Sequence, residues 1–189
     1  MDIIRQNNNQ AQGDIIGGNK TETTFNFINQ QTISELTRLY EKMKANDGVG
    51  EPSDNMFCEQ LEHYINASTD GDVRGLEVKL QESGRSELIP AATRMKERAT
   101  KAVMRYQTSR TAQRIYTIIL DELYTNFSLT VTPAIQSGAD RVEIDQRINL
   151  VLQNTRGVLG ENILELSVKD LWALLYFLGG NCHIRWDKC

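Results

Sequence analysis

The sequence predicts a mainly α-helical protein, a multi-helix bundle that carries a short β arm at its N-terminus. Three observations predict it. From residue 32 onward, apolar residues recur at intervals of three and four, which places them on one face of a helix. The stretch 171–178 is apolar on almost all sides, so we expect a central helix that other helices cover. Residues 1–30 are instead rich in Asn, Gln, Gly and Thr and lack helical periodicity.

The first thirty residues are expected to form short strands. Polar and apolar residues alternate crudely over 23–28, and glycines at 13, 17 and 18 bracket a pair of isoleucines, which is typical of a tight bend between extended pieces. Two strands alone are marginal in water, so the helical body or the same arm from other copies would have to complete them. The domain division is therefore a β arm over 1–30 and a helical interaction domain over 31–189. The candidate oligomerisation residues of the arm are Ile15, Ile16, Phe25 and Phe27.

The first part of the helical region predicts three helices. Thr32 and Glu35 have the spacing of a capping box, and an apolar face follows until the polar stretch 46–51 breaks the helix. A second helix is expected over about 53–67. A third, shorter helix is expected over about 73–82, ending at Gly84.

Two longer helices come next. Ser86 opens a helix that could run to Gln107, with Pro90 in its first turn, where the missing N–H does least harm. Ser109 then begins the longest apolar stripe of the chain, about 20 residues with a spacing of three and four. We expect this helix to be the mate of the C-terminal helix and Pro133 to bend or end it.

The sequence predicts the N-terminal caps of the last two helices. Asp140 with Glu143 predicts an N-terminal cap, and glycines at 157 and 160 predict a turn. Ser167 with Asp170 opens the apolar helix, and the Gly-Gly pair at 179 and 180 is expected to stop it in the left-handed conformation.

Composition indicates a soluble globular protein of one domain. The chain has 189 residues, of which 24% are charged and 40% hydrophobic. No apolar run approaches the roughly 20 residues of a membrane span, and the N-terminus lacks the pattern of a secretion signal. Three unevenly placed cysteines suit reduced thiols better than disulfides. We therefore expect a cytoplasmic protein.

The net charge of −4 hides a basic segment in the middle of the chain. Residues 85–114 contain eight Lys or Arg and two Asp or Glu, whereas the segments on either side are acidic. Four of the basic residues recur at steps of four, three and four and so share one helical face: Arg94, Arg98, Lys101 and Arg105. Such a face can follow a phosphate backbone, but a solvated face or a protein interface is the commoner use.

No motif predicts catalysis, a cofactor or a metal. The stretch GDIIGGNKT nearly spells a phosphate-binding loop, but Asn19 stands where the lysine must follow the last glycine, and no buried strand precedes it. Cys182, His183 and Cys189 do not have the spacing of zinc ligands. No pair of carboxylates is fixed in one place for acid–base work. We therefore expect a protein that is not an enzyme and binds no cofactor.

Three segments carry a resemblance to a known family: QGDIIGGNKT near the N-terminus, LTRLYEKMKA in the first helix and YFLGGNCHIRW at the end. Together they resemble the helical C-terminal domain of bacterial ABC three-component defence systems. In these systems an effector, a middle component and an SMC-like ABC ATPase act together against phage or plasmids. The resemblance implies docking and self-association and supplies no catalytic residue.

In that family the domain usually follows an effector domain. Only about 30 polar residues precede the helices here, too few for an effector. The resemblance therefore implies either a separate assembly subunit or a piece whose enzyme lies elsewhere.

The expected function is that of a non-enzymatic protein-interaction subunit of a bacterial anti-phage defence system. It would dock a protein partner, the effector or the ABC ATPase, and associate with copies of itself. The alternative is a nucleic-acid-binding subunit that uses the basic face of the helix at 86–107.

Overall fold

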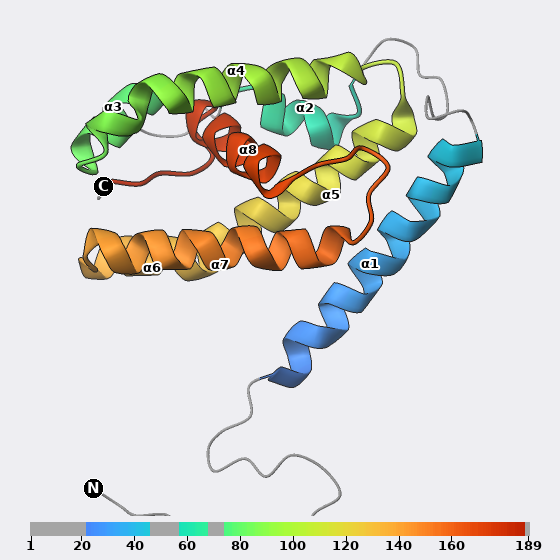
Figure 1. Cartoon of the computed structure of the whole chain (residues 1–189), viewed down its shortest axis with the longest axis horizontal. Coiled ribbons are helices and arrows are strands. Elements are labelled where there is room, and N and C mark those ends of the chain that lie inside the picture. The colour runs from blue at the N-terminus through green and yellow to red at the C-terminus, as the bar shows by residue number, and fades with distance from the viewer. Residues whose placement is uncertain (1–21, 46–56, 68–73, 188–189) are drawn as a thin grey trace, which may run out of the picture.

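The secondary-structure elements of the described residues are all helical. The computed structural model describes residues 22–45, 57–67 and 74–187. No strand occurs within these ranges, so the prediction of a mainly α-helical bundle is confirmed. The elements, in chain order, are α1 (Glu22–Ala45), α2 (Glu59–Ile65), α3 (Leu76–Glu82), the 3₁₀ turn η1 (Ser86–Leu88), α4 (Ile89–Arg105), α5 (Arg110–Asn126), the π-helical segment η2 (Phe127–Val131), α6 (Thr132–Ser137), α7 (Arg141–Leu159) and α8 (Val168–Gly180) (Figure 1).

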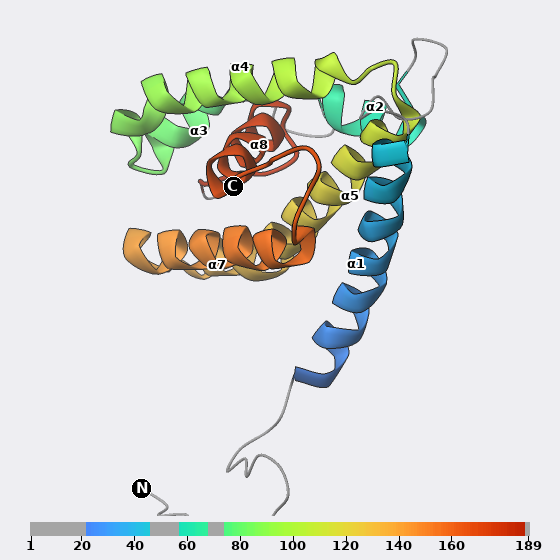
Figure 2. The same ribbon diagram turned by 45° about the vertical axis from the view of Figure 1, so that its right-hand side comes forward.

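Helix α8 lies at the centre of the fold. It runs between α4 and α7 in both ribbon views (Figures 1 and 2) and also contacts α3 and α5. Nearly every residue from Leu171 to Gly179 is buried, with Trp172 as the exception. Each large apolar side chain buried in this way stabilises the fold by about 1.5 to 3 kcal/mol. The prediction that the apolar stretch forms the central helix is confirmed.

The main neighbour of α8 is α4, and not α5 as the sequence suggested. The buried face of α4 consists of the small residues Ala92 and Ala99 together with Val103. Small side chains on this face let the two helix backbones approach closely. Helix α5 contacts α1, α2, α7 and α8 and is buried on most of its surface, so its long apolar stripe is shared among several neighbours.

The predicted starts of α5, α7 and α8 are confirmed. The side chains of Ser109 and Asp140 accept hydrogen bonds from backbone N–H groups in the first turns of α5 and α7. At α8 both halves of a capping box form. The Ser167 hydroxyl accepts from the backbone N–H of Asp170 at 3.4 Å, and the Asp170 carboxylate accepts from the backbone N–H of Ser167 at 3.0 Å.

The predicted β arm is wrong for residues 22–30, because α1 already begins at Glu22. Phe25 and Phe27 therefore lie in a helix, whereas Ile15 and Ile16 lie outside the described residues. The side chains of Leu36, Tyr40 and Met43 are buried and anchor the helix on the body. Once a helix is anchored, extending it costs less than starting a new element, and no Gly or Pro interrupts residues 22–45. Its first half projects away from the body (Figures 1 and 2).

The predicted capping box at Thr32 is wrong for the same reason, since this residue lies inside α1. Its hydroxyl instead donates a hydrogen bond to the Glu122 carboxylate of α5 at 3.2 Å. Thr32 therefore joins α1 to α5 and does not cap a helix.

Two predictions about glycines are also wrong. Gly157 lies inside α7, which ends at Leu159, so the predicted turn begins only at the C-cap residue Gly160, with φ 55°. Gly179 and Gly180 lie inside α8, and the left-handed residue after the helix is Cys182, with φ 65°. The role of Gly179 is steric, because a Cβ at this position would lie 2.3 Å from a ring carbon of Trp186.

Candidate partner-binding surfaces

The four basic residues singled out in the sequence lie together on α4. Their side chains are exposed and line one hollow of about 550 Å³. The opposite wall is the segment Leu164–Leu166 between α7 and α8. We refer to this site, lined by Arg94, Glu97, Arg98, Lys101, Arg105, Glu165 and Asp170, as the basic hollow.

The charges of the basic hollow are only partly balanced. Arg98 forms an ion pair with the Asp170 carboxylate in the first turn of α8, with Nη2 2.8 Å from Oδ1. Arg94, Lys101 and Arg105 form no ion pair with any residue in the described ranges. The hollow therefore presents three cations that form no ion pair within the described ranges, beside Arg98, which does.

The base of the basic hollow is buried and packed. Ala99 and Val103 fix α4 from below, and the buried Tyr116 ring packs against Tyr106 with centroids 6.0 Å apart. Burial raises the pKa of Tyr116, so its hydroxyl stays neutral at physiological pH. The basic side chains thus project from a packed helix and not from a loop.

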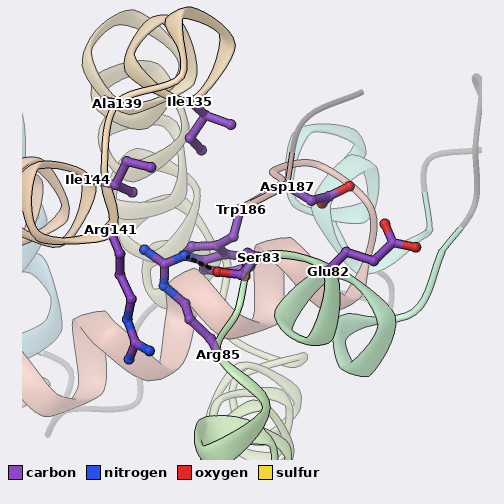
Figure 3. A pocket seen from close by; sticks show the side chains of 9 residues that line it. All are labelled: Glu82, Ser83, Arg85, Ile135, Ala139, Arg141, Ile144, Trp186 and Asp187. Carbon is purple, nitrogen blue, oxygen red and sulfur yellow. Dashed lines mark hydrogen bonds between the residues drawn. The ribbon is translucent and has the colours of Figure 1, made fainter.

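A second surface lies on the other side of the α8 N-terminal turns and was not predicted. A cavity of about 310 Å³ opens between the end of α3 and the α6–α7 connection, with Trp186, Arg85 and Arg141 among its lining residues (Figure 3). A neighbouring cavity of about 450 Å³ shares these three residues. We call this second cavity the tryptophan groove; it is lined by Arg85, Leu88, Arg141, Asp145, Ile148, Asn149, Leu152, Val168, Trp172, Tyr176 and Trp186.

Aromatic side chains form much of the tryptophan groove. Trp172 exposes 39% of its surface and stacks on Tyr176, with ring centroids 5.8 Å apart and an interplanar angle of 29°. Tyr176 in turn packs against Trp186 at 5.7 Å, and Trp186 contacts Phe127 edge to face at 5.8 Å. The groove therefore has a preformed aromatic wall that connects to the core.

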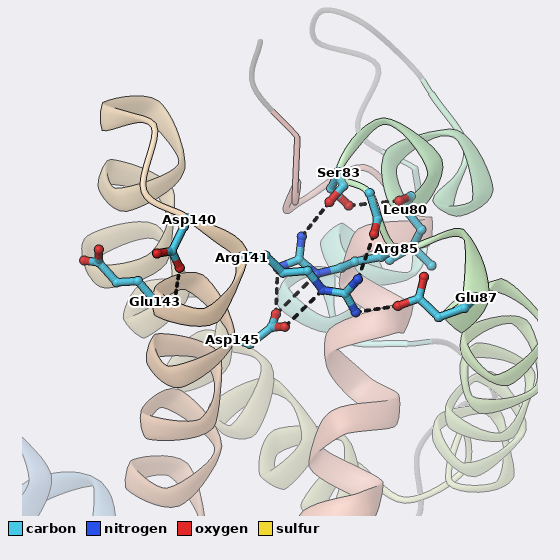
Figure 4. Close-up of polar contacts among 9 residues, drawn as sticks. Leu80, Ser83, Arg85, Glu87, Asp140, Arg141, Glu143 and Asp145 are labelled. Carbon is cyan, nitrogen blue, oxygen red and sulfur yellow. Dashed lines mark hydrogen bonds and ion pairs between the residues drawn. The ribbon is translucent and has the colours of Figure 1, made fainter.

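Two arginines join the groove to an ordered polar network (Figure 4). The Arg85 side chain is 3% exposed and donates to Asp145 Oδ1 from Nη2 at 2.6 Å and to the Ser83 carbonyl from Nη1 at 3.0 Å. Arg141 donates to Glu87, to Asp145 and to the Gly84 carbonyl. The network has two positive and two negative side chains, so it is neutral overall and fixes the α3–η1 turn on α7.

The sequence contained no indication of this network. Arg85 was counted with the basic segment, and its partner Asp145 lies 60 residues later in the chain. Only the packing of α3 and α7 around α8 brings the two together. The exposure of Trp172 could not be predicted either, because this residue stands in a stretch that is apolar on almost all sides.

The C-terminal motif GGNCHIRW is structural. The Asn181 amide donates to the Tyr64 and Ile65 carbonyls at 2.9 and 3.2 Å, which caps the end of α2. The buried Lys79 ammonium donates to the Gly179 and Ile184 carbonyls at 2.7 and 3.2 Å, and burial lowers its pKa. These bonds fix the turn after α8.

Cys182 and His183 make other contacts within the fold. The Cys182 thiol donates to the Arg74 carbonyl at 3.5 Å, and the His183 ring lies 5.0 Å from that of His63. Within the ranges that the structure describes, no group of three or more His, Cys, Asp and Glu could hold a metal ion. Cys189 lies outside those ranges. A search of the same ranges also finds no helix of the length and apolarity that crossing a bilayer requires.

A family model matches residues 75–186, which is more than half of the chain. The family is described as C-terminal domain 9 of the ABC-three component (ABC-3C) systems. No curated protein and no solved structure matches the chain. The matched range begins just before α3 and ends at Trp186, so it contains the basic hollow and the tryptophan groove. The chain therefore belongs to the C-terminal domain 9 family of the ABC-three component systems.

Proposed function

We propose that this protein is a non-enzymatic assembly subunit of its ABC three-component system and docks a protein partner, the effector or the ABC ATPase, through the tryptophan groove. Membership in a family of C-terminal domains of these systems supports a role beside other system proteins. The observation that carries the proposal is the half-exposed Trp172 in an aromatic groove that the folded body holds open. Trp, Tyr and Arg are the residues that most often dominate binding at protein interfaces.

The groove favours an apolar anchor from the partner. Its arginines already have carboxylate partners, so an incoming charge would find no unpaired counter-charge there. Leu88 and Val168, which line the groove and are only partly buried, would gain together with Trp172 from the burial of an apolar or aromatic side chain. Its volume of about 450 Å³ leaves room for such a side chain.

We further propose that the subunit acts in anti-phage defence in the bacterial cytoplasm and that it associates with copies of itself. Because residues 22–30 lie in α1, they do not support self-association by the pairing of strands. The part of the proposal that rests on Ile15 and Ile16 is tested by comparing the sedimentation of the full chain with that of a variant lacking residues 1–21. Equal oligomeric states would remove the arm from the proposal.

The docking proposal is tested by co-purifying the full-length protein with the effector and the ABC ATPase of its own system. Trp172→Ala should weaken binding of one of them by at least tenfold, since loss of a central aromatic anchor costs about 2 kcal/mol or more. Leu150→Ala is the matched control, because Leu150 is 60% exposed on α7 and does not line the groove. Equal retention of both partners by the two variants would refute the proposal.

Nucleic-acid binding through the basic hollow is the second candidate function. It is supported by Arg94, Lys101 and Arg105 on α4, which form no ion pair with another described residue. Duplex DNA binding should then fall steeply with salt, because counterions are released on binding, and Arg98→Glu with Lys101→Glu should abolish it. A DNA affinity that is unchanged by this double substitution would eliminate the candidate.

A further inference from the structure

We infer that the basic hollow binds an acidic helix of a partner protein, at a surface separate from the tryptophan groove. Asp170 and Trp172, two residues apart on α8, line the hollow and the groove respectively. The two surfaces share no lining residue. This inference concerns a different set of residues from the docking proposal, so each can fail without the other.

The first step is the geometry of the cations. Arg94, Lys101 and Arg105 share one face of α4, with Arg94 and Arg105 eleven residues apart, which is about 16 Å along the helix axis. A second helix lying beside α4 can present carboxylates at the same intervals of three and four residues. The Leu164–Leu166 wall limits the hollow on its other side and gives such a helix a defined seat.

The second step is that three of the basic side chains form no ion pair. The three cations have no ion-pair partner in the part of the chain that the structure describes, whereas Arg98 already has Asp170. An incoming Asp or Glu would form charge-assisted hydrogen bonds with these three side chains. Their exposure keeps each gain modest, so binding requires several pairs at once.

The third step separates a protein from a nucleic acid. Three carboxylates, Glu97, Glu165 and Asp170, line the same hollow as the four basic side chains. Duplex DNA carries a negative charge about every 1.7 Å and would bring phosphates within a screening length of about 8 Å of these carboxylates. A protein helix can instead place Asp or Glu opposite the cations and Lys or a neutral residue opposite Glu97. The mixed charge of the hollow therefore favours a patterned acidic helix over a uniform polyanion.

The test uses the full-length protein and labelled probes in an anisotropy titration. The main probe is a helical peptide of about 18 residues with Glu along one face at intervals of three and four and one Lys placed opposite Glu97. The comparison probes are a peptide of the same composition in scrambled order and a duplex DNA of about 20 base pairs. The patterned peptide should bind at least tenfold more tightly than either of them.

Two double variants decide whether the hollow is the site. Arg94→Glu with Lys101→Glu should weaken peptide binding at least tenfold, whereas Arg38→Glu with Lys44→Glu makes the same charge change on exposed positions of α1 and should leave it unchanged. Thermal unfolding checks that both variants fold. Equal binding of the two peptides, equal effects of the two double variants, or absence of binding would overturn the inference.

A tighter complex with duplex DNA that is lost in the same α4 variant would also overturn it, in favour of a nucleic-acid site. A third variant sharpens this distinction. Glu97→Lys removes the central carboxylate, so it should weaken binding of the patterned peptide and strengthen binding of DNA. An opposite pair of changes would contradict the assignment of Glu97.

Discussion

The contact between Gly179 and Trp186 shows how much a single missing side chain can matter. The Trp186 ring lies on the bare backbone of α8, where a methyl group would lie 2.3 Å from a ring carbon. The Gly-Gly pair is visible in the sequence. The packing of the Trp186 ring against Gly179 could not be predicted, because it depends on how the chain turns at Cys182.

We expect Gly179→Ala to destabilise the protein by about 1 to 3 kcal/mol, the usual cost of overpacking a core. Gly157→Ala is the control, because Gly157 lies inside α7 with no atom within 4 Å of a Cβ built there. It should stabilise the helix by up to about 1 kcal/mol. Urea unfolding of the two variants measures both effects, and equal midpoints would show that the ring does not press on Gly179.

His183 gives the fold a dependence on pH. Burial, and then the nearby His63, lowers the pKa of His183 below its ordinary value. The unfolded chain therefore binds a proton more readily than the folded one once the pH falls below about 6.5. Stability should be greatest above this value and decrease as the pH falls below it. In His183→Gln this decrease should be smaller, and an equal pH slope in both proteins would contradict the assignment.

For single residues, the sequence and the structure agree most clearly on the row of basic side chains along α4. Steps of four, three and four fix the relative directions of side chains on any helix, so Arg94 to Arg105 could be placed on one face without a structure. The Arg85–Asp145 pair could not be predicted, since nothing local relates two residues 60 positions apart.

At the level of elements, the sequence predicted helix starts better than helix partners. A capping side chain acts within its own first turn, so Ser109, Asp140 and Ser167 are readable locally. The start of α1 was missed because its first two turns have a composition typical of strands and loops. There the anchored remainder of the helix determines the local conformation.

Ser167→Ala should cost about 1 kcal/mol of stability, because it removes the side chain that caps α8. The loss should be seen in global unfolding and not only in local fraying, since α8 contacts α3, α4, α5 and α7. Thr37→Ala is a suitable control, as its exposed hydroxyl bonds only within α1, to the Ile33 carbonyl. A larger loss in the control than in Ser167→Ala would contradict the role of the cap.

For the molecule as a whole, the central place of α8 predicts a single cooperative unfolding transition. Trp172 and Trp186 lie on α8 and on the turn that follows it, so their fluorescence reports on the centre of the bundle. Circular dichroism reports on all helices together. The two transitions should coincide in urea. A fluorescence change that precedes the loss of helix would show that the tryptophan groove opens independently.

The segregation of charge along the chain was visible in the sequence at this scale, but its meaning was not. The basic segment divides in the fold. Arg85 is buried in a neutral network, Arg98 is paired with Asp170, and Arg94, Lys101 and Arg105 stay available. A count of charges cannot separate these uses, because the difference lies in which acidic residues the other helices bring near.

The position of α8 in the chain also has a consequence for biosynthesis. A ribosome makes the surfaces of α4, α5 and α7 before the helix that covers them, and Trp186 emerges later still. Until then the nascent polypeptide presents apolar faces that aggregate readily or recruit chaperones. Premature termination anywhere before Val168 would leave those faces permanently uncovered, so such products should be removed by cellular proteolysis and not accumulate as a shorter working subunit.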